Sequence, residues 1–264
     1  MAEFNAKDVQ RLRQATGVGM MDAKKALEEC HGDYEAAIEW LRVHGKMSNA
    51  KRADREATEG AVAAVRDGAV AALVQLRSET DFVAKAPEFV ALVDELAASV
   101  AANGTDVVDQ FDGEIERLRT TLKENISVGA VARLEAADGQ VVDTYLHQQA
   151  GRGVNAVAVV LEGGGEELAH DIAVHIAFTR PTYLSRDEVP EADLEKERAI
   201  IEETARNEGK PDAALAKIAE GRLSAWIKER VLLEQSYVRD EKQTITQLLG
   251  PAKIVRFSQV VIGS

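Results

Sequence analysis

The feature that most constrains the fold is a strand that runs into a helix across a short polar connector. Residues 69–76 are apolar and predict a strand, while an apolar pattern with helical spacing begins at Pro87. The connector between them reads Ser-Glu-Thr-Asp-Phe-Val-Ala-Lys-Ala over residues 78–86. Binding residues concentrate on short loops that rigid elements support, so this connector is a candidate contact site.

The connector carries a carboxylate and an aromatic ring side by side, at Asp81 and Phe82. Two interpretations follow from these residues. In the first, both side chains form an exposed tip that contacts a partner. In the second, Phe82 is a core residue beneath the hairpin and Asp81 is a negative charge near a helix N-terminus. The local sequence leaves both interpretations open.

Composition limits the classes of function. The formal net charge of -13 argues against nucleic acid as a direct partner, because phosphates are bound largely by Lys and Arg. Cys30 is the single cysteine, which excludes an intramolecular disulfide and a cysteine-based metal cluster. The chain has no apolar run near 18 residues and no secretory leader. These features predict a cytoplasmic protein that needs no membrane, metal or cofactor.

The N-terminal part of the chain predicts a compact helical unit. Residues 1–45 contain three short helical patterns separated by glycine breaks, and Asn5 followed by Asp8 suits the first helix start. Met20 and Met21 suit either an adaptable contact or the core of this unit. Residues 46–59 are highly charged and predict a solvated helix or linker.

The middle of the chain predicts two small units, each an antiparallel sheet with helices. In residues 60–126 a hairpin over 61–76 precedes helices near 87–103 and 113–125. In residues 127–190, strands over 128–136 and 141–147 predict a second hairpin, followed by a strand over 154–161 and a helix. These patterns are typical of an α+β fold.

The C-terminal part predicts two further modules. Residues 191–234 read as two helices, 191–207 and 212–233, joined by a turn that contains Gly and Pro, and they predict a projecting helical hairpin. Residues 235–264 contain a short helix over 244–249 and a strand over 254–262 that returns to the second sheet.

Catalytic and cofactor motifs are absent from the sequence. It contains no phosphate loop, no dinucleotide-binding glycine pattern and no nucleophile elbow. His170 and His175 are five residues apart and point to different sides of a helix, so they do not form a metal pair. His147 ends a strand and could be a base, a partner contact or a surface residue. A binding protein fits the chain better than an enzyme.

Four motifs in the same order resemble the bacterial elongation factor Ts family over essentially the whole chain. They are the N-terminal VQRLRQATGVGMMDAKKAL, the connector RSETDFVAK, DIAVHIAFTRPTYL at 171–184, and EGKPDAALAKIAEGRLSAWIKERVLLEQSYV at 208–238. The YLH sequence at 145–147 also matches. The resemblance implies a guanine nucleotide exchange factor that releases GDP from elongation factor Tu. It also implies a ubiquitin-associated-like N-terminal domain and a coiled-coil-like helical hairpin.

The resemblance also implies roles for individual residues. Thr80, Asp81, Phe82 and Val83 match the tip that enters the G domain of elongation factor Tu and disturbs its magnesium site. His147 matches a histidine that assists this tip. Arg13, Met20 and Met21 match the edge of the N-terminal unit that contacts the G domain near the nucleotide base. These matches favour the exposed interpretation of Phe82.

Two positions depart from the family pattern. Ala23 stands where many members have cysteine, and Asn155 interrupts a strand where apolar residues are usual, so the burial of that strand is open. Two rival functions also remain open. One is a hydrolase or transferase that uses His147 with a nearby carboxylate. The other is an adaptor that binds its partner without changing nucleotide release.

Overall fold

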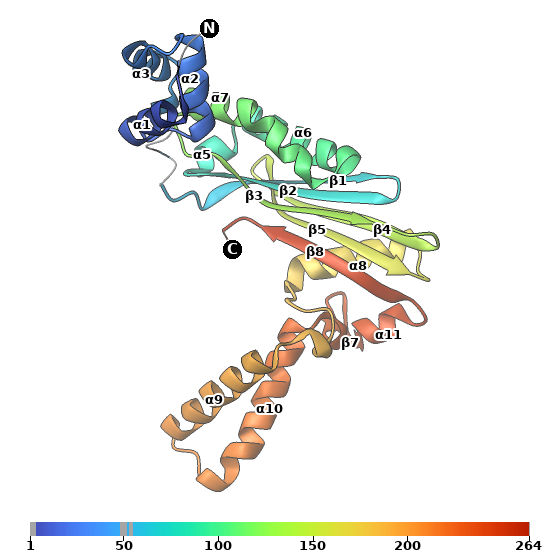
Figure 1. The fold of residues 1–264 in the computed structure, drawn as a ribbon. Coiled ribbons are helices and arrows are strands. Elements are labelled where there is room, and N and C mark those ends of the chain that lie inside the picture. The colour runs from blue at the N-terminus through green and yellow to red at the C-terminus, as the bar shows by residue number, and fades with distance from the viewer. Residues whose placement is uncertain (1–3, 48–51, 53–54, 264) are drawn as a thin grey trace.

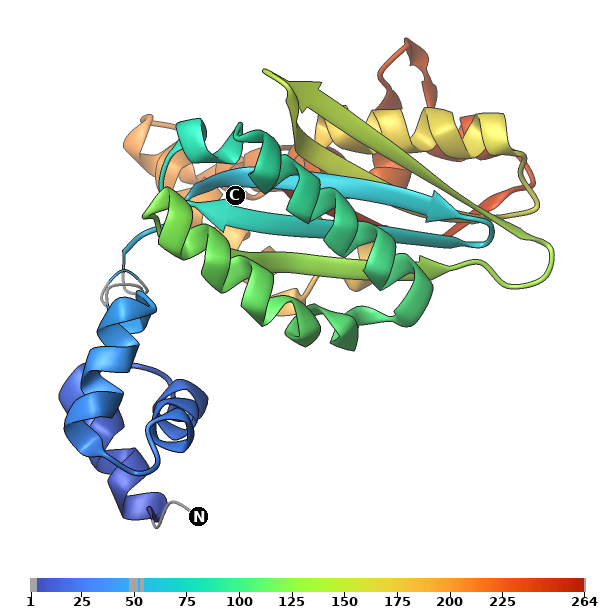
Figure 2. The same cartoon turned by 90° about the horizontal axis from the view of Figure 1, so that it is seen from above.

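The computed structural model describes residues 4–47, 52 and 55–263. Two three-stranded antiparallel sheets lie face to face, with helices on the outer side of each sheet (Figures 1 and 2). A three-helix unit lies at the N-terminal end of this body, and a helical hairpin projects from the other end. The predicted α+β class, with N-terminal helices and small antiparallel sheets, is confirmed.

The N-terminal unit consists of α1 (Ala6–Thr16), α2 (Met20–Glu29) and α3 (Tyr34–Val43). The predicted helix start is confirmed, because the Asn5 side chain accepts from backbone N–H groups and Asp8 completes a capping box. Lys46 joins the unit to the core, since its Nζ lies 3.1 Å from Asp22 and 3.4 Å from Glu116. Residues 48–51, 53 and 54 of the predicted 46–59 linker lie outside the described residues.

The first sheet has the order β1-β2-β3 and contains β1 (Glu59–Asp67), β2 (Val70–Ser78) and β3 (Ser127–Glu135). Its outer face is covered by α6 (Pro87–Asn103) and α7 (Asp112–Leu122), which a 3₁₀ segment, η1 (Thr105–Phe111), connects. The hairpin and both helices agree with the sequence prediction. Pro87 stands in the first turn of α6, where its missing N–H costs no helical hydrogen bond.

The second sheet has the order β4-β5-β8 and contains β4 (Gln140–Gln149), β5 (Arg152–Glu162) and β8 (Lys253–Val261). Its outer face is covered by α8 (Glu166–Thr179). The prediction that the last strand returns to this sheet is confirmed. The interruption at Asn155 does not expose β5, because the amide donates to Ala177 O at 2.8 Å and accepts from Gln259.

The predicted hairpin over 128–147 is wrong. β3 pairs with β2 in the first sheet, whereas β4 pairs with β5 in the second. The Asp138-Gly139 turn therefore carries the chain from one sheet to the other. A turn signal specifies a change of direction and not the strand edge that the chain joins next. The sequence prediction places residues 127–135 in the second unit, whereas they pair in the first sheet. The division of the chain into domains stays a prediction.

Both central strands are buried on two faces, which explains their nearly continuous apolar sequences. In β2, Val74 and Leu76 pack toward α6, whereas Leu73 packs toward the second sheet. In β5, Val159 packs toward α8 and Val160 toward the first sheet. Successive side chains of a strand point to opposite faces, so a strand between two layers needs apolar residues at every position.

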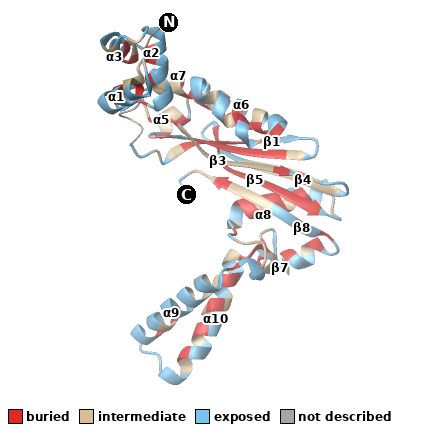
Figure 3. Cartoon of the chain, viewed as in Figure 1, coloured by how far each residue is buried: buried red, intermediate tan, exposed pale blue. Residues whose placement is uncertain are grey.

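The helical hairpin consists of α9 (Glu191–Asn207) and α10 (Asp212–Arg230), as predicted. Its outward faces are exposed, while a narrow apolar seam joins the two helices (Figure 3). The chain then forms a small hairpin that the sequence did not predict, β6 (Ser236–Tyr237) with β7 (Asp240–Thr244). The short helix that was predicted over 244–249 follows as α11 (Ile245–Leu249). None of the helices in the described residues has the length and apolar character that a membrane crossing requires.

Candidate functional site: an exposed tip after β2

The connector after β2 contains a short helix that the sequence did not predict, α5 (Asp81–Ala84). Thr80 caps this helix, because its side chain accepts a hydrogen bond from Val83 N. Ala84 is buried and Val83 is half-buried, and both pack on the core of the first sheet. Residues 80–83, called the tip below, are therefore held by a capped helical turn.

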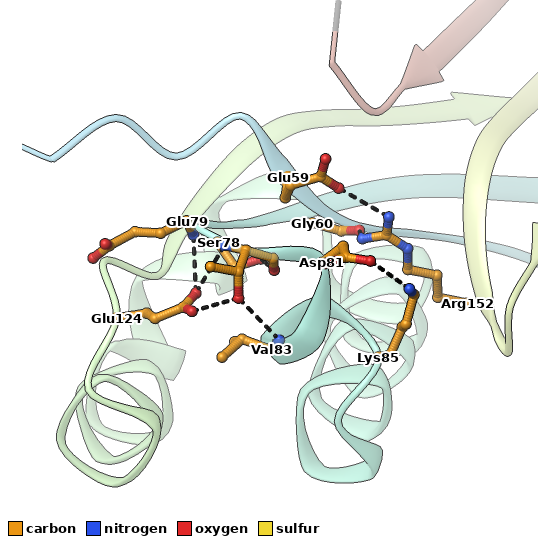
Figure 4. A network of polar contacts seen from close by, with 10 residues as sticks. Glu59, Gly60, Ser78, Glu79, Asp81, Val83, Lys85, Glu124 and Arg152 are labelled. Carbon is orange, nitrogen blue, oxygen red and sulfur yellow. Dashed lines mark hydrogen bonds and ion pairs between the residues drawn. The ribbon is translucent and has the colours of Figure 1, made fainter.

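Glu124, which follows α7, holds the base of the tip (Figure 4). Its carboxylate accepts from the backbone N–H of Glu79 at 3.0 Å, from the N–H of Thr80 at 3.1 Å, and from the Thr80 hydroxyl. Glu79 in turn accepts from Asn125 N at 2.6 Å. Hydrogen bonds to an ionised carboxylate are stronger than those between neutral groups, so this arrangement orders the connector.

Phe82 projects from the tip, and 83% of its surface is exposed. The interpretation of Phe82 as a core residue beneath the hairpin is therefore wrong. Two residues of α5 explain this orientation, because Val83 and Ala84 occupy the inward face of the turn. An aromatic ring held in solvent on an ordered turn is suited to insertion between elements of another protein.

Asp81 lies beside Phe82 and is ionised. Its carboxylate accepts from Lys85 Nζ one helical turn later (Figure 4). The hydrogen bond and charge of Lys85, together with the charge of Arg152, hold the pKa of Asp81 below its ordinary value, and desolvation opposes them. The tip therefore presents a negative charge next to an apolar ring.

His147 lies on β4 of the second sheet and is exposed. Its Nδ1 lies 3.4 Å from the Tyr145 hydroxyl. It lines a surface cavity of about 640 Å³ together with Arg152 and Glu59, and Arg152 is one of the charges that act on Asp81. Arg152 is therefore the residue that His147 shares a cavity with and that also acts on the tip.

The rival enzyme function expected a carboxylate partner for His147. The carboxylate on the same strand, Asp143, is instead bound to His170 at 2.9 Å and to Arg66 at 3.5 Å. Within the described residues, no group of three or more His, Cys, Asp or Glu side chains is placed to hold a metal ion.

Arg13, Met20 and Met21 lie on the N-terminal helical unit and not on the sheets that carry the tip. All three are exposed, with Met20 at 46% and Met21 at 73% of its surface. Neither methionine belongs to the core of the unit, which is formed by other residues. The adaptable-contact interpretation of the two methionines is therefore compatible with the structure.

Sequence reasoning missed two residues that support the site, Glu124 and Arg152. Glu124 gave no signal, because it is 44 residues from the Thr80 that it holds. Arg152 had a signal, since it stands between Gly151 and Gly153 at the start of a strand. Glycine in a strand often marks a place where another backbone approaches closely, so Gly153 was the signal beside Arg152.

The comparisons with known proteins identify the family of this chain. The family model for elongation factor Ts matches residues 79–264. The chain belongs to the elongation factor Ts family. An elongation factor Ts from Kineococcus radiotolerans is 44% identical over 266 residues, which cover 96% of each chain. One from Clavibacter michiganensis subsp. michiganensis is 43% identical over 278 residues, which cover 100% of each chain.

A third relative, elongation factor Ts from Mycolicibacterium smegmatis, is 43% identical over 277 residues, which cover 100% of this chain and 99% of the relative. Elongation factor Ts is the nucleotide exchange factor for elongation factor Tu in translation elongation, and it is not an enzyme. Elongation factor Tu is therefore the partner that this family membership implies. The rival hydrolase or transferase function is excluded.

Proposed function

We propose that residues 80–83 enter the G domain of elongation factor Tu and disturb the site that holds Mg²⁺ and the phosphates of GDP. The observation that carries this proposal is the exposure of Phe82, at 83% of its surface, on a tip that Glu124 and the Thr80 cap hold in place. An ordered apolar projection loses little conformational entropy when it binds.

An exchange factor releases GDP only if it binds the nucleotide-free GTPase more tightly than the GDP-bound form. The coupling is reciprocal, so GDP weakens the binding of the factor by the same ratio. Each tenfold of coupling requires about 1.4 kcal/mol of contact that exists only in the open state. Burying a phenylalanine side chain contributes about 1.5–3 kcal/mol, so insertion of Phe82 alone would supply roughly a tenfold to hundredfold effect.

Asp81 supplies a different contribution. Its carboxylate would act on the water and charge arrangement around Mg²⁺ and would not become a lasting metal ligand. The Lys85 contact lowers the pKa of this carboxylate in the free factor. His147 would assist the tip from the second sheet, and the exposed Arg13, Met20 and Met21 would contact the G domain near the nucleotide base.

We also propose finer roles for the modules of the fold. The unit of residues 1–45 would act as a ubiquitin-associated-like domain, and α9 with α10 as a coiled-coil-like module. Residues 235–264 would form a C-terminal module. The factor would bind both GDP-bound and nucleotide-free elongation factor Tu in the cytoplasm, with no direct contact to nucleic acid or membrane and no cofactor of its own.

The test is stopped-flow release of fluorescent GDP from elongation factor Tu, with the factor varied to saturation. Phe82→Ala should fold normally and lower the maximal release rate by at least about tenfold. Ile200→Ala is the control, because it removes an exposed apolar side chain, 48% exposed, from α9 at the far end of the molecule. It should leave the maximal rate unchanged.

Two results would contradict the proposal. A folded Phe82→Ala protein with a normal maximal rate would show that the tip is not the exchanging element. Binding of elongation factor Tu by the wild type without any acceleration of GDP release would instead support the adaptor alternative. Asp81→Asn in the same assay separates the contribution of the charge from that of the ring.

A further inference from the structure

The proposed site is divided between two sheets, which raises the question of what fixes its geometry. The tip follows β2 of the first sheet, whereas His147 lies on β4 of the second. Hydrogen bonds within either sheet do not set the position of one sheet relative to the other. A fixed separation between the tip and His147 therefore needs a contact that crosses the sheets.

Arg152 makes such a contact. It begins β5, pairs with Gln149 of β4, and is tied to the strand of His147 by the β4–β5 register, in which His147 pairs with Asn155. Its guanidinium extends to the first sheet (Figure 4). There Nη2 donates to Glu59 at 2.9 Å, and Nη1 donates to the carbonyl oxygen of Gly60.

The acceptors of Arg152 lie at the base of the tip. In the β1–β2 register Glu59 pairs with Ser78 and Gly60 pairs with Arg77, and these are the last two residues of β2. The tip starts two residues after Ser78. Arg152 therefore links β5, which pairs with the strand of His147, to the end of β2 from which the tip projects.

The backbones approach closely at this crossing. A Cβ atom on Gly153 would lie 2.1 Å from Val62 O, and one on Gly60 would lie 2.2 Å from Leu76 O. Neither position tolerates a side chain without displacement of backbone. Gly153 thus allows β5 to lie near enough to β1 of the first sheet for Arg152 to span the two sheets, whereas Gly60 allows the close approach of β1 and β2 within the first sheet.

Burying Arg152 here lowers the stability of the fold relative to an apolar residue, so packing alone does not account for it. It is 9% exposed, and its Nε has no hydrogen-bond partner among the residues that the structure describes. A buried charged group with an unpaired donor is usually less stabilising than an apolar group of similar volume. The guanidinium also acts electrostatically on Asp81, although Lys85 has the larger effect.

We propose that Arg152 is a positioning residue for nucleotide exchange, which fixes the tip and His147 relative to each other by bonding to Glu59 and Gly60. The inference rests on the proposed role of the tip. It predicts that loss of Arg152 affects the rate of GDP release from the bound complex more than the formation of that complex.

The experiment measures GDP release from elongation factor Tu as a function of factor concentration for Arg152→Met, Arg152→Lys and Phe82→Ala. Arg133→Met is the matched control. Arg133 also donates to a backbone carbonyl, Ala101 O at 3.2 Å, and to a glutamate at 2.8 Å, but it does not connect the two sheets. Thermal unfolding of each variant is recorded in parallel.

Arg152→Met should lower the maximal rate by about tenfold and change the half-saturating concentration by less than about twofold, since misplaced groups mainly reduce the rate of the bound state. Arg152→Lys should recover part of the rate. Arg133→Met should behave as wild type in both quantities. An unchanged maximal rate in folded Arg152→Met, or an equal loss in Arg133→Met, would overturn the inference.

The double variant Phe82→Ala with Arg152→Met should lose less than the product of the two single losses, because Arg152 then has no ring to position. A loss equal to that product would contradict the inference. A normal rate in Phe82→Ala would overturn the tip assignment and this inference with it, whereas a slow Phe82→Ala beside a normal Arg152→Met would overturn this inference alone.

Glu59→Gln tests the same inference if Arg152→Met does not fold. This change removes the charged acceptor of Nη2 and leaves the bond to Gly60 O in place. It should lower the maximal rate by about threefold, less than the loss of the whole guanidinium. A folded Glu59→Gln protein with the wild-type maximal rate would overturn the inference.

Discussion

Glu124 and Thr80 are 44 residues apart in the chain and are joined by two hydrogen bonds, one to the Thr80 N–H at 3.1 Å and one to its hydroxyl. A third bond joins the same carboxylate to the N–H of Glu79 at 3.0 Å. A single side chain after α7 thus organises the turn between β2 and α5. The ordered tip is a product of this long-range contact.

Replacement of Glu124 should destabilise the protein and slow exchange together. Glu124→Ala leaves the N–H groups of Glu79 and Thr80 without their acceptor, which should lower the free energy of unfolding by about 1–3 kcal/mol. Urea denaturation measures this change. Glu95→Ala, an exposed mid-helix control in α6, should change it by less than about 0.5 kcal/mol. Equal stabilities for the two variants would refute the role of Glu124.

The contact between Lys85 and Asp81 should be visible in the pKa of Asp81. Lys85→Met removes the hydrogen bond that is the largest cause of the lowered pKa, so the pKa should rise toward 3.8. Because the folded pKa is depressed, this contact stabilises the protein above the unfolded pKa, and the stabilisation is lost as pH falls through the folded pKa. An NMR titration of the Asp81 carboxyl carbon tests the shift, and identical titrations in both proteins would contradict it.

His175 should make stability depend on pH. It is fully buried, its Nδ1 accepts from Val238 N at 3.2 Å, and its Nε2 lies 2.9 Å from Gln235 Oε1, which fits a neutral ring. Burial lowers its pKa below 6.5, although the Gln235 bond acts in the opposite direction. As the pH falls, the unfolded chain therefore takes up a proton on this histidine before the folded protein does. The stabilisation from the neutral, buried ring is fully present above pH 6.5 and is lost as the pH drops toward the folded pKa.

His175→Gln provides the comparison for this pH dependence. Urea unfolding from about pH 5 to 8 should give a steeper dependence for the wild type, by up to about 1.4 kcal/mol per pH unit, since one additional proton is bound on unfolding. The other four histidines are shared by both proteins and cancel in the comparison. Parallel curves for the two proteins would show that protonation of His175 is not linked to unfolding.

The helical hairpin contains two glycines with opposite expectations. Gly221 lies inside α10 with open space around its Cβ position, so Gly221→Ala should stabilise the protein by about 0.5–1 kcal/mol. Gly209 lies between α9 and α10 with φ +76°, where alanine is strained, so Gly209→Ala should destabilise it. Thermal unfolding tests both signs. A stabilised Gly221→Ala protein with slower exchange would mark this face of α10 as a partner contact.

Local patterns predicted most of the helices and strands. The predicted helix over 191–207 has the bounds of α9, and the Asn5 cap and the Pro87 start are present as expected. These features depend on interactions within about four residues, which the sequence displays directly. The pairing of β3 with β2 was not predicted, because the same apolar strand fits either sheet and the turn before β4 does not select an edge.

At the candidate site, too, the sequence predicted the local element and the tertiary structure decided its orientation. The sequence placed Asp81 and Phe82 on a connector between a strand and a helix and left the orientation of Phe82 open. The structure resolves it, because Ala84 and Val83 take the inward face of the α5 turn and leave Phe82 in solvent. Nothing near residue 82 indicates that Glu124 would order this turn.

The sequence alone determined most helices and strands of this protein, the helix starts at Asn5 and Pro87, and the family, since apolar periodicity, capping residues and motifs are local properties of the chain. The tertiary structure decided which strands pair, which side of the tip faces solvent, and that Arg152 crosses from one sheet to the other. These depend on contacts between residues tens of positions apart. Such contacts form only when both faces of β2 and β5 are buried together, and no single segment specifies that arrangement.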